Sequence, residues 1–238
     1  MSHPRKKLHE RIEVVFEDQD VIVVDKAAGI LSYPVEGDRE ESAIQLIRRF
    51  WKVQNNRSDH LYLMHRLDKE TSGLIVFTKT SQARDSLRKQ FEEHSVVRGY
   101  LAITEGIPKQ KSGKIQTFLG RNERGKRSVT RLGKSAITHY QVLSFNPEMR
   151  RSLVRCYLHT GRTHQVRIHL AHIGTSVVGD PVYGKRNKDR MALHAEVLGF
   201  LHPRNKQPLL LRTSLPEGMR ELLGSRSNCV YLEPGSFR

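Results

Sequence analysis

The feature that most constrains the fold of this 238-residue chain is a long series of short apolar segments bounded by turn residues. Segments of this length, rich in Val, Ile, Leu and aromatic residues, are typical of β-strands. The sequence predicts strands at residues 12–16, 21–25, 74–77, 96–104, 114–119, 136–145, 153–160, 193–200 and 208–212. Helices can therefore occupy only the stretches between these strands.

Apolar residues at helical spacing occur in a few of those stretches. The first expected helix begins at Ser42, and Ser81 is placed to cap the second. A third helix is expected over residues 166–173, and a short one opens at Pro216. Strands that outnumber helices in this way predict an α+β fold with a mixed, largely antiparallel β-sheet and flanking helices.

The charge of the chain is unbalanced and concentrated. Lys and Arg number 41 against 25 Asp and Glu, which gives a formal net charge of +16. Residues 107–167 hold 14 of the basic residues and 2 of the acidic ones, so this segment carries +12 of that excess. Such a field is typical of a protein that binds a polyanion. We expect nucleic acid rather than a membrane surface, because no basic amphipathic helix of the membrane type accompanies the charge.

Several classes of protein are disfavoured by composition. Cys156 and Cys229 are the only cysteines, too few for a disulfide scaffold or a four-ligand zinc site. The N-terminal residues lack the apolar stretch of a signal peptide, and no apolar run has the length of a membrane span. We therefore expect a cytoplasmic protein that does not enter a membrane.

A glycine-rich segment at residues 120–126 nearly matches a phosphate-binding P-loop. Arg127 follows Lys126 where the P-loop has Ser or Thr, so the magnesium ligand is missing. A strand rather than a helix is expected to follow, so no helix N-terminus would face a phosphate. We interpret the segment as a basic hairpin loop that contacts a polyanion.

Four histidines lie close together in the sequence, at positions 159, 164, 169 and 172. His169 and His172 could share a helix face, but no His-Glu-x-x-His pattern or carboxylate pair accompanies them. We expect no metal site. Contacts to a substrate, or ordinary hydrogen bonding within the fold, explain these histidines better.

The segment His65-Arg66-Leu67-Asp68 is the sharpest candidate for chemistry. Neighbouring positive charge favours the ionised form of the Asp68 carboxylate, and an ionised carboxylate can act as a nucleophile or a base. From these residues alone, an ion pair in a loop is the simpler interpretation.

Together with other segments, this stretch resembles the catalytic motif of the RluA-type RNA pseudouridine synthases. Further segments agree with that family in the same order, and the similarity extends over residues 12–223. They lie at residues 17–29, 98–102, 161–169, 179–184, 193–195 and 200–203. Several ordered motifs are far more specific than any one of them.

The resemblance implies that the protein isomerises uridine to pseudouridine within RNA, without a cofactor or a metal. It implies that Asp68 is the catalytic aspartate, acting on the sugar carbon or on the base. Tyr100 would stack on the target base and assist proton movement, and Arg167 would pair with Asp68. Arg66 would replace the nucleotide that is flipped out of the stack.

The resemblance also implies contacts between structured RNA, either tRNA or rRNA, and a further group of side chains: His65, Arg162, His164 and Gln165. Arg98 stands where the family usually has Lys. We expect a basic N-terminal tail over residues 1–11 and a single catalytic domain over 12–238. An added RNA-binding module of the S4 type is not expected, nor is an oligomer. A non-catalytic RNA-binding factor and a metal-dependent nuclease are the competing hypotheses.

Overall fold

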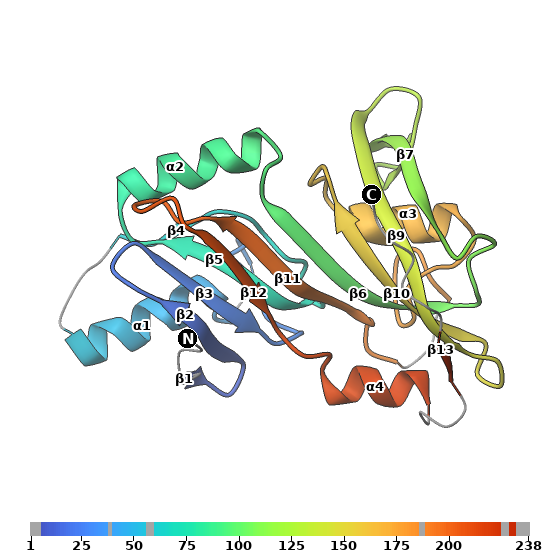
Figure 1. The fold of residues 1–238 in the computed structure, drawn as a ribbon, viewed down its shortest axis with the longest axis horizontal. Coiled ribbons are helices and arrows are strands. Elements are labelled where there is room, and N and C mark those ends of the chain that lie inside the picture. Colours follow the sequence, from blue (N-terminus) through green and yellow to red (C-terminus); the bar gives the residue numbers. More distant parts are fainter. Residues whose placement is uncertain (1–5, 38–39, 56–59, 186–188, 225–228, 232–238) are drawn as a thin grey trace. The chain divides into compact units, whose positions relative to one another are not determined.

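The computed structural model describes residues 6–37, 40–55, 60–185, 189–224 and 229–231. The chain divides into two compact units, each built from two segments (Figure 1). The first unit contains Met1–Val97 and Ala195–Thr213, and the second contains Arg98–His194 and Ser214–Arg238. The units are described separately below.

The first unit contains two helices and a group of strands. In chain order its elements are β1 (Lys6–His9), β2 (Ile12–Glu17), β3 (Val21–Lys26), α1 (Ala43–Asn55), β4 (Tyr62–Leu63), β5 (Ser72–Thr78), α2 (Ser81–Glu92), most of β11 (Leu193–Leu201) and β12 (Pro208–Arg212). The strands lie in the order β1-β2-β3-β5-β11, β4 also pairs with β5, and β12 pairs with β11. The pairings of β1 with β2, β2 with β3, β3 with β5, β4 with β5 and β11 with β12 are antiparallel.

The core of the first unit lies around β3 and β5. Each strand contains a run of four apolar residues and is buried on both faces, which is typical of central strands. Leu87 of α2 packs with Val21 and Val23 of β3 and with Leu74 and Val76 of β5. The same strands lead at their ends into the loops that carry the candidate site.

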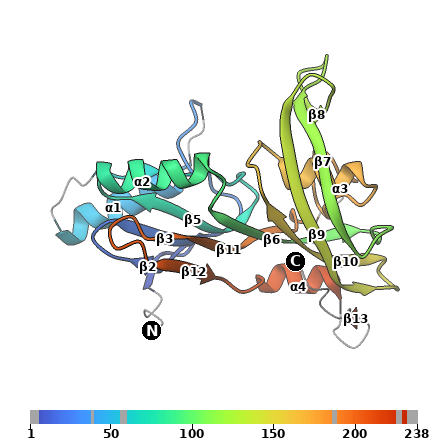
Figure 2. The same cartoon turned by 45° about the horizontal axis from the view of Figure 1, so that its top comes forward.

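The second unit is built on an antiparallel group of strands, several of them long. Its elements are β6 (Val97–Glu105), β7 (Ser112–Arg121), β8 (Arg127–Val129), β9 (Lys134–Asn146), β10 (Arg151–Leu158), α3 (Gln165–His172), α4 (Glu217–Leu223) and β13 (Val230–Tyr231). The strand order is β6-β10-β9-β7-β8, with β13 added to β9. Figure 2 shows β7, β8 and β9 running side by side.

One face of this sheet is covered by α3. Burial alternates along β9 and β10, as expected for strands with one packed face. Ile168 of α3 packs on Leu119 of β7 and Ala136 of β9. The covered face therefore holds the helix in which Arg167 lies.

The predicted α+β architecture with a largely antiparallel sheet is confirmed. Each predicted strand and helix exists, although Thr80 rather than Ser81 caps α2, through a bond from the Ala83 amide to its hydroxyl at 3.2 Å. Residues 122–126 form the turn between β7 and β8, so the basic hairpin loop is also confirmed. The strand expected after the glycine-rich segment exists as β8. Among the described residues, three short strands were not predicted: β1, β4 and β13.

The missed β1 lies within the predicted N-terminal tail. Residues 6–9 pair with β2, whereas residues 1–5 of that tail lie outside the described residues. Strands of two to four residues carry too little apolar pattern to be recognised without their partner. The single catalytic domain over 12–238 stays a prediction. Among the described helices, none combines the length and apolar character that crossing a bilayer requires.

Candidate active site

The Asp68 loop joins β4 to β5 in the first unit. The Met64 amide donates to the Val76 carbonyl at 3.3 Å, and the Thr71 amide donates to the Asp68 carbonyl at 3.1 Å. These bonds hold the start of the loop against β5 and close a tight turn after Asp68. Asp68 is half-buried, and Arg66 is exposed two residues earlier.

A buried lysine at the end of β3 fixes the far side of this loop. Lys26 has no exposed surface, and its Nζ donates to the carbonyls of Ala27 at 3.0 Å, Ile30 at 2.8 Å and Lys69 at 3.2 Å. The Gly29 amide donates to the same Lys69 carbonyl at 2.8 Å. An ammonium group has three donors, and these three carbonyls match them. Lys26 therefore holds the residue that follows Asp68.

Ser32 fixes the residue that precedes Asp68. Its hydroxyl donates to the Leu67 carbonyl at 2.9 Å and accepts from the Leu67 amide at 3.0 Å. Both groups are buried, so these bonds are made away from water. The loop after β3 thus grips the chain on each side of Asp68, and we assign Lys26 and Ser32 as positioning residues. The sequence analysis gave neither residue a role, although Lys26 is a charged residue at the end of an apolar strand.

Gly73 lets β5 start immediately after the loop. Its φ of +113° lies where side chains are strained, and an added Cβ would overlap the backbone of Ala195 in β11. A glycine is therefore required for the Asp68 loop to enter the sheet at this point.

His65 is bound inside the first unit. Its Nε2 accepts from the Val76 amide at 3.3 Å, and its ring lies 5.4 Å from that of Phe91. Accepting this bond requires a ring nitrogen without a proton. In the structure His65 therefore anchors the loop to β5 and α2, and its predicted contact with RNA stays a prediction.

Arg167 is held by a buried carboxylate in the second unit. Its Nε and Nη2 donate to Asp180 at 2.7 and 2.8 Å, in the bidentate geometry that suits guanidinium and carboxylate. Asp180 is fully buried and also accepts from the amides of Val182 and Tyr183. Burial raises the pKa of Asp180, but the bonds from Arg167 and the two amides outweigh it, so the pKa lies below its ordinary value.

Tyr183 covers the guanidinium of Arg167. The guanidinium carbon of Arg167 lies 5.2 Å from the centre of the Tyr183 ring. The Tyr183 hydroxyl lies 3.0 Å from Nδ1 of His164. The sequence resemblance included residues 179–184 but gave neither Asp180 nor Tyr183 a role, and the structure shows that both orient predicted site residues.

Gln165 organises the turn before α3. Its Oε1 accepts from the Thr160 hydroxyl and the Arg162 amide, both at 2.9 Å. Its Nε2 donates to the Ile137 carbonyl at 2.9 Å and the Thr138 hydroxyl at 3.0 Å. The side chain is buried and makes four hydrogen bonds to protein atoms. Gln165 therefore has a positioning role in this fold, and direct contact with RNA stays a prediction.

Arg98 packs beneath the same turn. It is buried, and desolvation lowers the pKa of its guanidinium. Nη2 donates to the His159 carbonyl at 3.2 Å, and a Cβ added at Gly161 would overlap Nη1. Gly161 therefore leaves room for the guanidinium of Arg98. The next residue, Arg162, donates from Nε to the Ser135 carbonyl at 3.0 Å.

Tyr100 lies on β6 opposite Cys156 of β10. Tyr100 is 8% exposed and Cys156 is fully buried. Burial raises the pKa of the Cys156 thiol to about 12, so this cysteine stays protonated and unreactive. The residue opposite Tyr100 on β10 is thus a neutral thiol.

Both ring nitrogens of His169 lie within hydrogen-bonding distance of protein hydroxyl groups. Its Nδ1 and Nε2 lie 2.8 and 3.0 Å from the hydroxyls of Thr138 and Thr117. Burial, with a smaller contribution from His172, lowers the pKa of His169 to about 4. It is a neutral histidine that joins α3 to β7 and β9.

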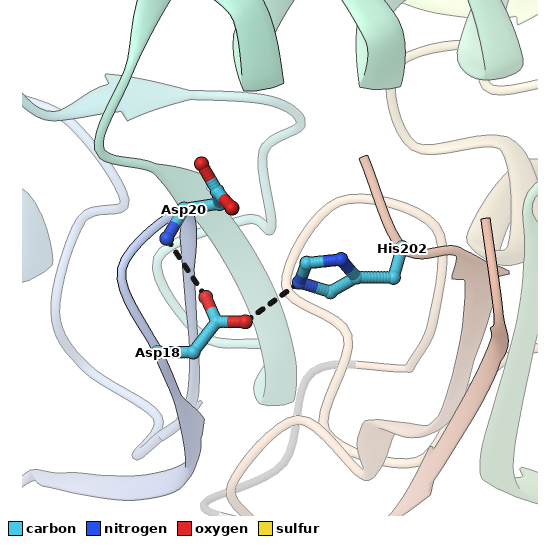
Figure 3. A group of neighbouring side chains, drawn as sticks. All are labelled: Asp18, Asp20 and His202. Carbon is cyan, nitrogen blue, oxygen red and sulfur yellow. Dashed lines mark hydrogen bonds and ion pairs between the residues drawn. The ribbon is translucent and has the colours of Figure 1, made fainter. Parts of the chain in front are cut away.

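One group of metal-ligand type side chains occurs among the described residues, in the first unit at Asp18, Asp20 and His202 (Figure 3). Asp18 accepts from the Asp20 amide at 2.8 Å and from Nε2 of His202 at 2.6 Å. Arg204 binds both oxygens of Asp20, and its hydrogen bonds lower the pKa of Asp20. Because protein partners already use these atoms, the group fastens the β2–β3 turn to the β11–β12 turn. The expectation that the protein uses no metal stays a prediction.

The predicted site residues fall on two units. His65, Arg66 and Asp68 lie together in one loop of the first unit. The other predicted residues lie in the second unit: Tyr100, Arg162, His164, Gln165 and Arg167. The predicted pairing of Arg167 with Asp68 stays a prediction.

Comparison with known families gives one match over most of the chain. The family described as RNA pseudouridylate synthase matches residues 20–172. This range includes the Asp68 loop, both of its positioning residues, Tyr100 and Arg167.

Curated proteins of similar sequence agree with this match. The uncharacterized RNA pseudouridine synthase YlyB of Bacillus subtilis is 37% identical over 219 residues, which covers 89% of this chain and 72% of that protein. The ribosomal large subunit pseudouridine synthase D of Zymomonas mobilis is 35% identical over 229 residues, covering 89% and 71% respectively.

Solved structures share the fold. Human RNA pseudouridylate synthase domain containing 1 has a TM-score of 0.74 and 24% identity, covering 98% of this chain and 94% of that chain. Human RNA pseudouridylate synthase domain containing 4 has a TM-score of 0.73 and 24% identity, covering 88% and 91%.

Proposed function

Because the chain belongs to the RNA pseudouridylate synthase family, we propose that Asp68 carries out the isomerisation of uridine to pseudouridine in structured RNA. In this reaction the bond between the base and its sugar carbon breaks, and a ring carbon of the same base makes the new bond. That ring carbon loses a proton, and the released ring nitrogen gains one, so the atoms balance without a cofactor. The expected resemblance to the RluA-type enzymes is confirmed at the level of the family.

Asp68 acts on the sugar carbon or on the base, and its loop supports either role. A catalytic group must be held within a narrow range of positions to be effective. Lys26 and Ser32 provide this by binding the residues on each side of Asp68. This two-sided grip within the matched family region is the observation that carries the assignment of Asp68.

Tyr100 and Arg167 complete the proposed catalytic group. Tyr100 stacks on the target base, and Arg167 keeps the Asp68 carboxylate ionised. Asp180 holds Arg167 in place by accepting from its Nε and Nη2. Arg66, exposed in the same loop as Asp68, fills the place of the flipped nucleotide.

The exposed basic residues of segment 107–167 bind the RNA backbone, and Arg162 and His164 of that segment take part in this contact. The substrate is tRNA or rRNA, and the name of the Zymomonas relative favours large-subunit rRNA. The protein acts as a monomer in the cytoplasm. Since phosphate contacts release counterions, binding weakens steeply between low and physiological salt.

The test is the substitution Asp68→Asn, assayed on RNA from a strain that lacks the gene. The variant should bind this RNA with nearly unchanged affinity but form no pseudouridine, measured by tritium release and by chemical mapping of the modified position. Comparable turnover by the variant would overturn the role of Asp68. If the wild-type protein bound RNA and changed no uridine, the competing hypothesis of a non-catalytic RNA-binding factor would replace the proposed function.

A further inference from the structure

The first unit contains a pocket that the proposed catalytic residues do not use. It has a volume of about 460 Å³, within the range of roughly 300–1,000 Å³ that is usual for small-ligand sites. Its walls come from the loop after β3, from α1, from β4 with the residues just before it, and from α2. The lining residues are Tyr33, Ile44, Arg48, His60, Leu61, Tyr62, Leu63 and Arg84.

Three ring-bearing side chains line this pocket: Tyr33, His60 and Tyr62. The rings of His60 and Tyr62 are stacked, with their centres 6.2 Å apart and their planes at 27°. The guanidinium of Arg84 lies 4.9 Å from the centre of the Tyr62 ring. Tyr33 is 52% exposed, although a tyrosine ring in a loop could have been packed into the core. Flat groups are therefore presented to solvent next to one another, which suits a flat aromatic ligand.

The charges of the pocket are cationic. Its lining contains Arg48 and Arg84 and no Asp or Glu. Arg48 donates one bond from Nη2 to the Leu61 carbonyl at 3.2 Å, and Arg84 donates one from Nε to Asp85 at 2.8 Å. A guanidinium has five donors in a planar fork, so each of these bonds uses one of them. The other N–H donors of these two guanidinium groups suit the binding of a phosphate group.

The pocket is tied to the Asp68 loop through the backbone. Tyr33 directly follows Ser32, whose hydroxyl makes two bonds to Leu67, the residue before Asp68. The strand β4, which supplies Tyr62, leads directly into the same loop. Residues that line the pocket are therefore joined along the chain, or through Ser32, to the loop that carries Asp68.

We propose that this pocket receives an unpaired nucleotide of the substrate RNA, outside the target uridine. Its base stacks on the rings of Tyr33 and of the His60–Tyr62 pair, and its phosphate binds Arg48 and Arg84. Aromatic side chains and arginine planes are the groups that recognise unstacked bases in single-stranded RNA. The pocket thereby selects RNAs with an unpaired nucleotide near the modified one. This inference rests on the proposed function, because it takes RNA as the substrate.

The direct test measures binding of an unstructured, fluorescein-labelled oligouridylate of twelve nucleotides by fluorescence anisotropy. Asp68→Asn serves as the parent protein, so that no turnover occurs during the measurement. Tyr33→Ala should weaken binding about 5- to 150-fold, the range that corresponds to loss of one base–aromatic stack. Leu210→Ala is the matched control, because Leu210 lies on β12 of the same unit and is 55% exposed. It should change the affinity less than 2-fold, roughly the scale of a neutral surface substitution.

Two further variants separate stacking from loss of structure. Tyr33→Trp retains a flat ring and should restore most of the affinity. Arg84→Gln should weaken binding and lower the slope of log affinity against log salt by about 1. Lys89→Gln on the same helix is its control, since Lys89 is exposed and does not line the pocket.

The proposal is overturned if Tyr33→Ala weakens binding no more than Leu210→Ala, or if Tyr33→Trp binds no better than Tyr33→Ala. Crosslinking of the same oligonucleotide, with 4-thiouridine in place of uridine, should label Tyr33 or Tyr62; labels confined to the second unit would also overturn it. Failure of the proposed function is a different result. In that case the wild-type protein forms no pseudouridine, whether or not the binding differences are present.

Discussion

Replacing Asp180 by Asn should show how strongly the fold depends on the carboxylate that holds Arg167. Oδ1 of Asp180 accepts from Arg167 Nη2 and from the amides of Val182 and Tyr183, and Oδ2 accepts from Arg167 Nε. An asparagine keeps the oxygen but places an NH₂ group where Oδ2 stood. That group meets the Nε donor of Arg167, so one bond is replaced by two opposed donors.

The expected loss of stability follows from burial. Asp180 has no exposed surface, and the Arg167 side chain is 5% exposed. Removing one partner of such a buried pair leaves the other charge uncompensated, which costs about 3–5 kcal/mol. The matched control is Asp189→Asn in the same unit, where the Asp189 side chain is 29% exposed and binds Arg151 at 2.6 Å. A partly exposed pair of this kind contributes about 1 kcal/mol or less.

The assay is urea denaturation of the wild type and both variants at pH 7, combined with pseudouridine formation. We expect Asp180→Asn to lose about 3–5 kcal/mol. It should also lower kcat more than it raises KM, since Arg167 is no longer aimed. A loss below about 1 kcal/mol, equal to that of the control, would show that the buried pair does not hold Arg167 as argued.

The pH dependence provides a second check on the same pair. Because the pKa of Asp180 in the folded protein is lowered, its contribution to stability is fully present above the unfolded value near 3.9. That contribution is lost as the pH falls through the lower folded value. Wild-type stability should therefore fall more steeply on acidification below about pH 4 than that of Asp180→Asn. Parallel curves would contradict this assignment.

Three other substitutions or reactions test the site. In the same denaturation assay, Gly73→Ala should lower the free energy of unfolding by more than about 3 kcal/mol, because its Cβ overlaps the Ala195 backbone in addition to straining φ. The control Gly37→Ala, with φ +86° in open space, should lower it by about 1–3 kcal/mol. Equal losses would show that the overlap has no effect. Lys26→Met should lower the free energy of unfolding by at least about 2 kcal/mol, because it leaves three carbonyls without their donor. It should also speed hydrogen exchange in residues 66–71, and unchanged exchange would show that Lys26 does not hold the Asp68 loop. Cys156 should resist iodoacetamide at pH 7.5 until the protein unfolds, as followed by mass spectrometry; native modification at the denatured rate would refute its burial.

Much of the fold could be predicted from local sequence. The apolar runs that became β3 and β5 and the helical spacing in α1 and α2 are properties of neighbouring residues, and each was located within a few positions. The turn at residues 122–126 could be predicted from Gly125 and the charged residues beside it. The Asp68 segment was identified by its resemblance to a family motif, and its surroundings were not predicted.

The grip on the Asp68 loop could not be predicted because its partners are far apart in the chain. Lys26 and Lys69 are separated by 43 residues, and Ser32 and Leu67 by 35. A lysine in a sequence is expected to be exposed, and only three converging carbonyls make its complete burial possible. The three carbonyls converge only when the loops pack together, so no local sequence pattern predicts this arrangement.

The sequence by itself determined the kinds of element in this protein, the concentration of positive charge and the family of its motifs, because each depends on residue type and short-range order. Only the tertiary structure decided which polar groups meet. It placed Asp180 against Arg167, made Gln165 and His169 into internal hydrogen-bonding groups, and gathered rings and guanidinium groups from four separate segments into one pocket. A buried polar group must find its partner wherever the chain brings one, and that choice is made by packing rather than by sequence neighbours.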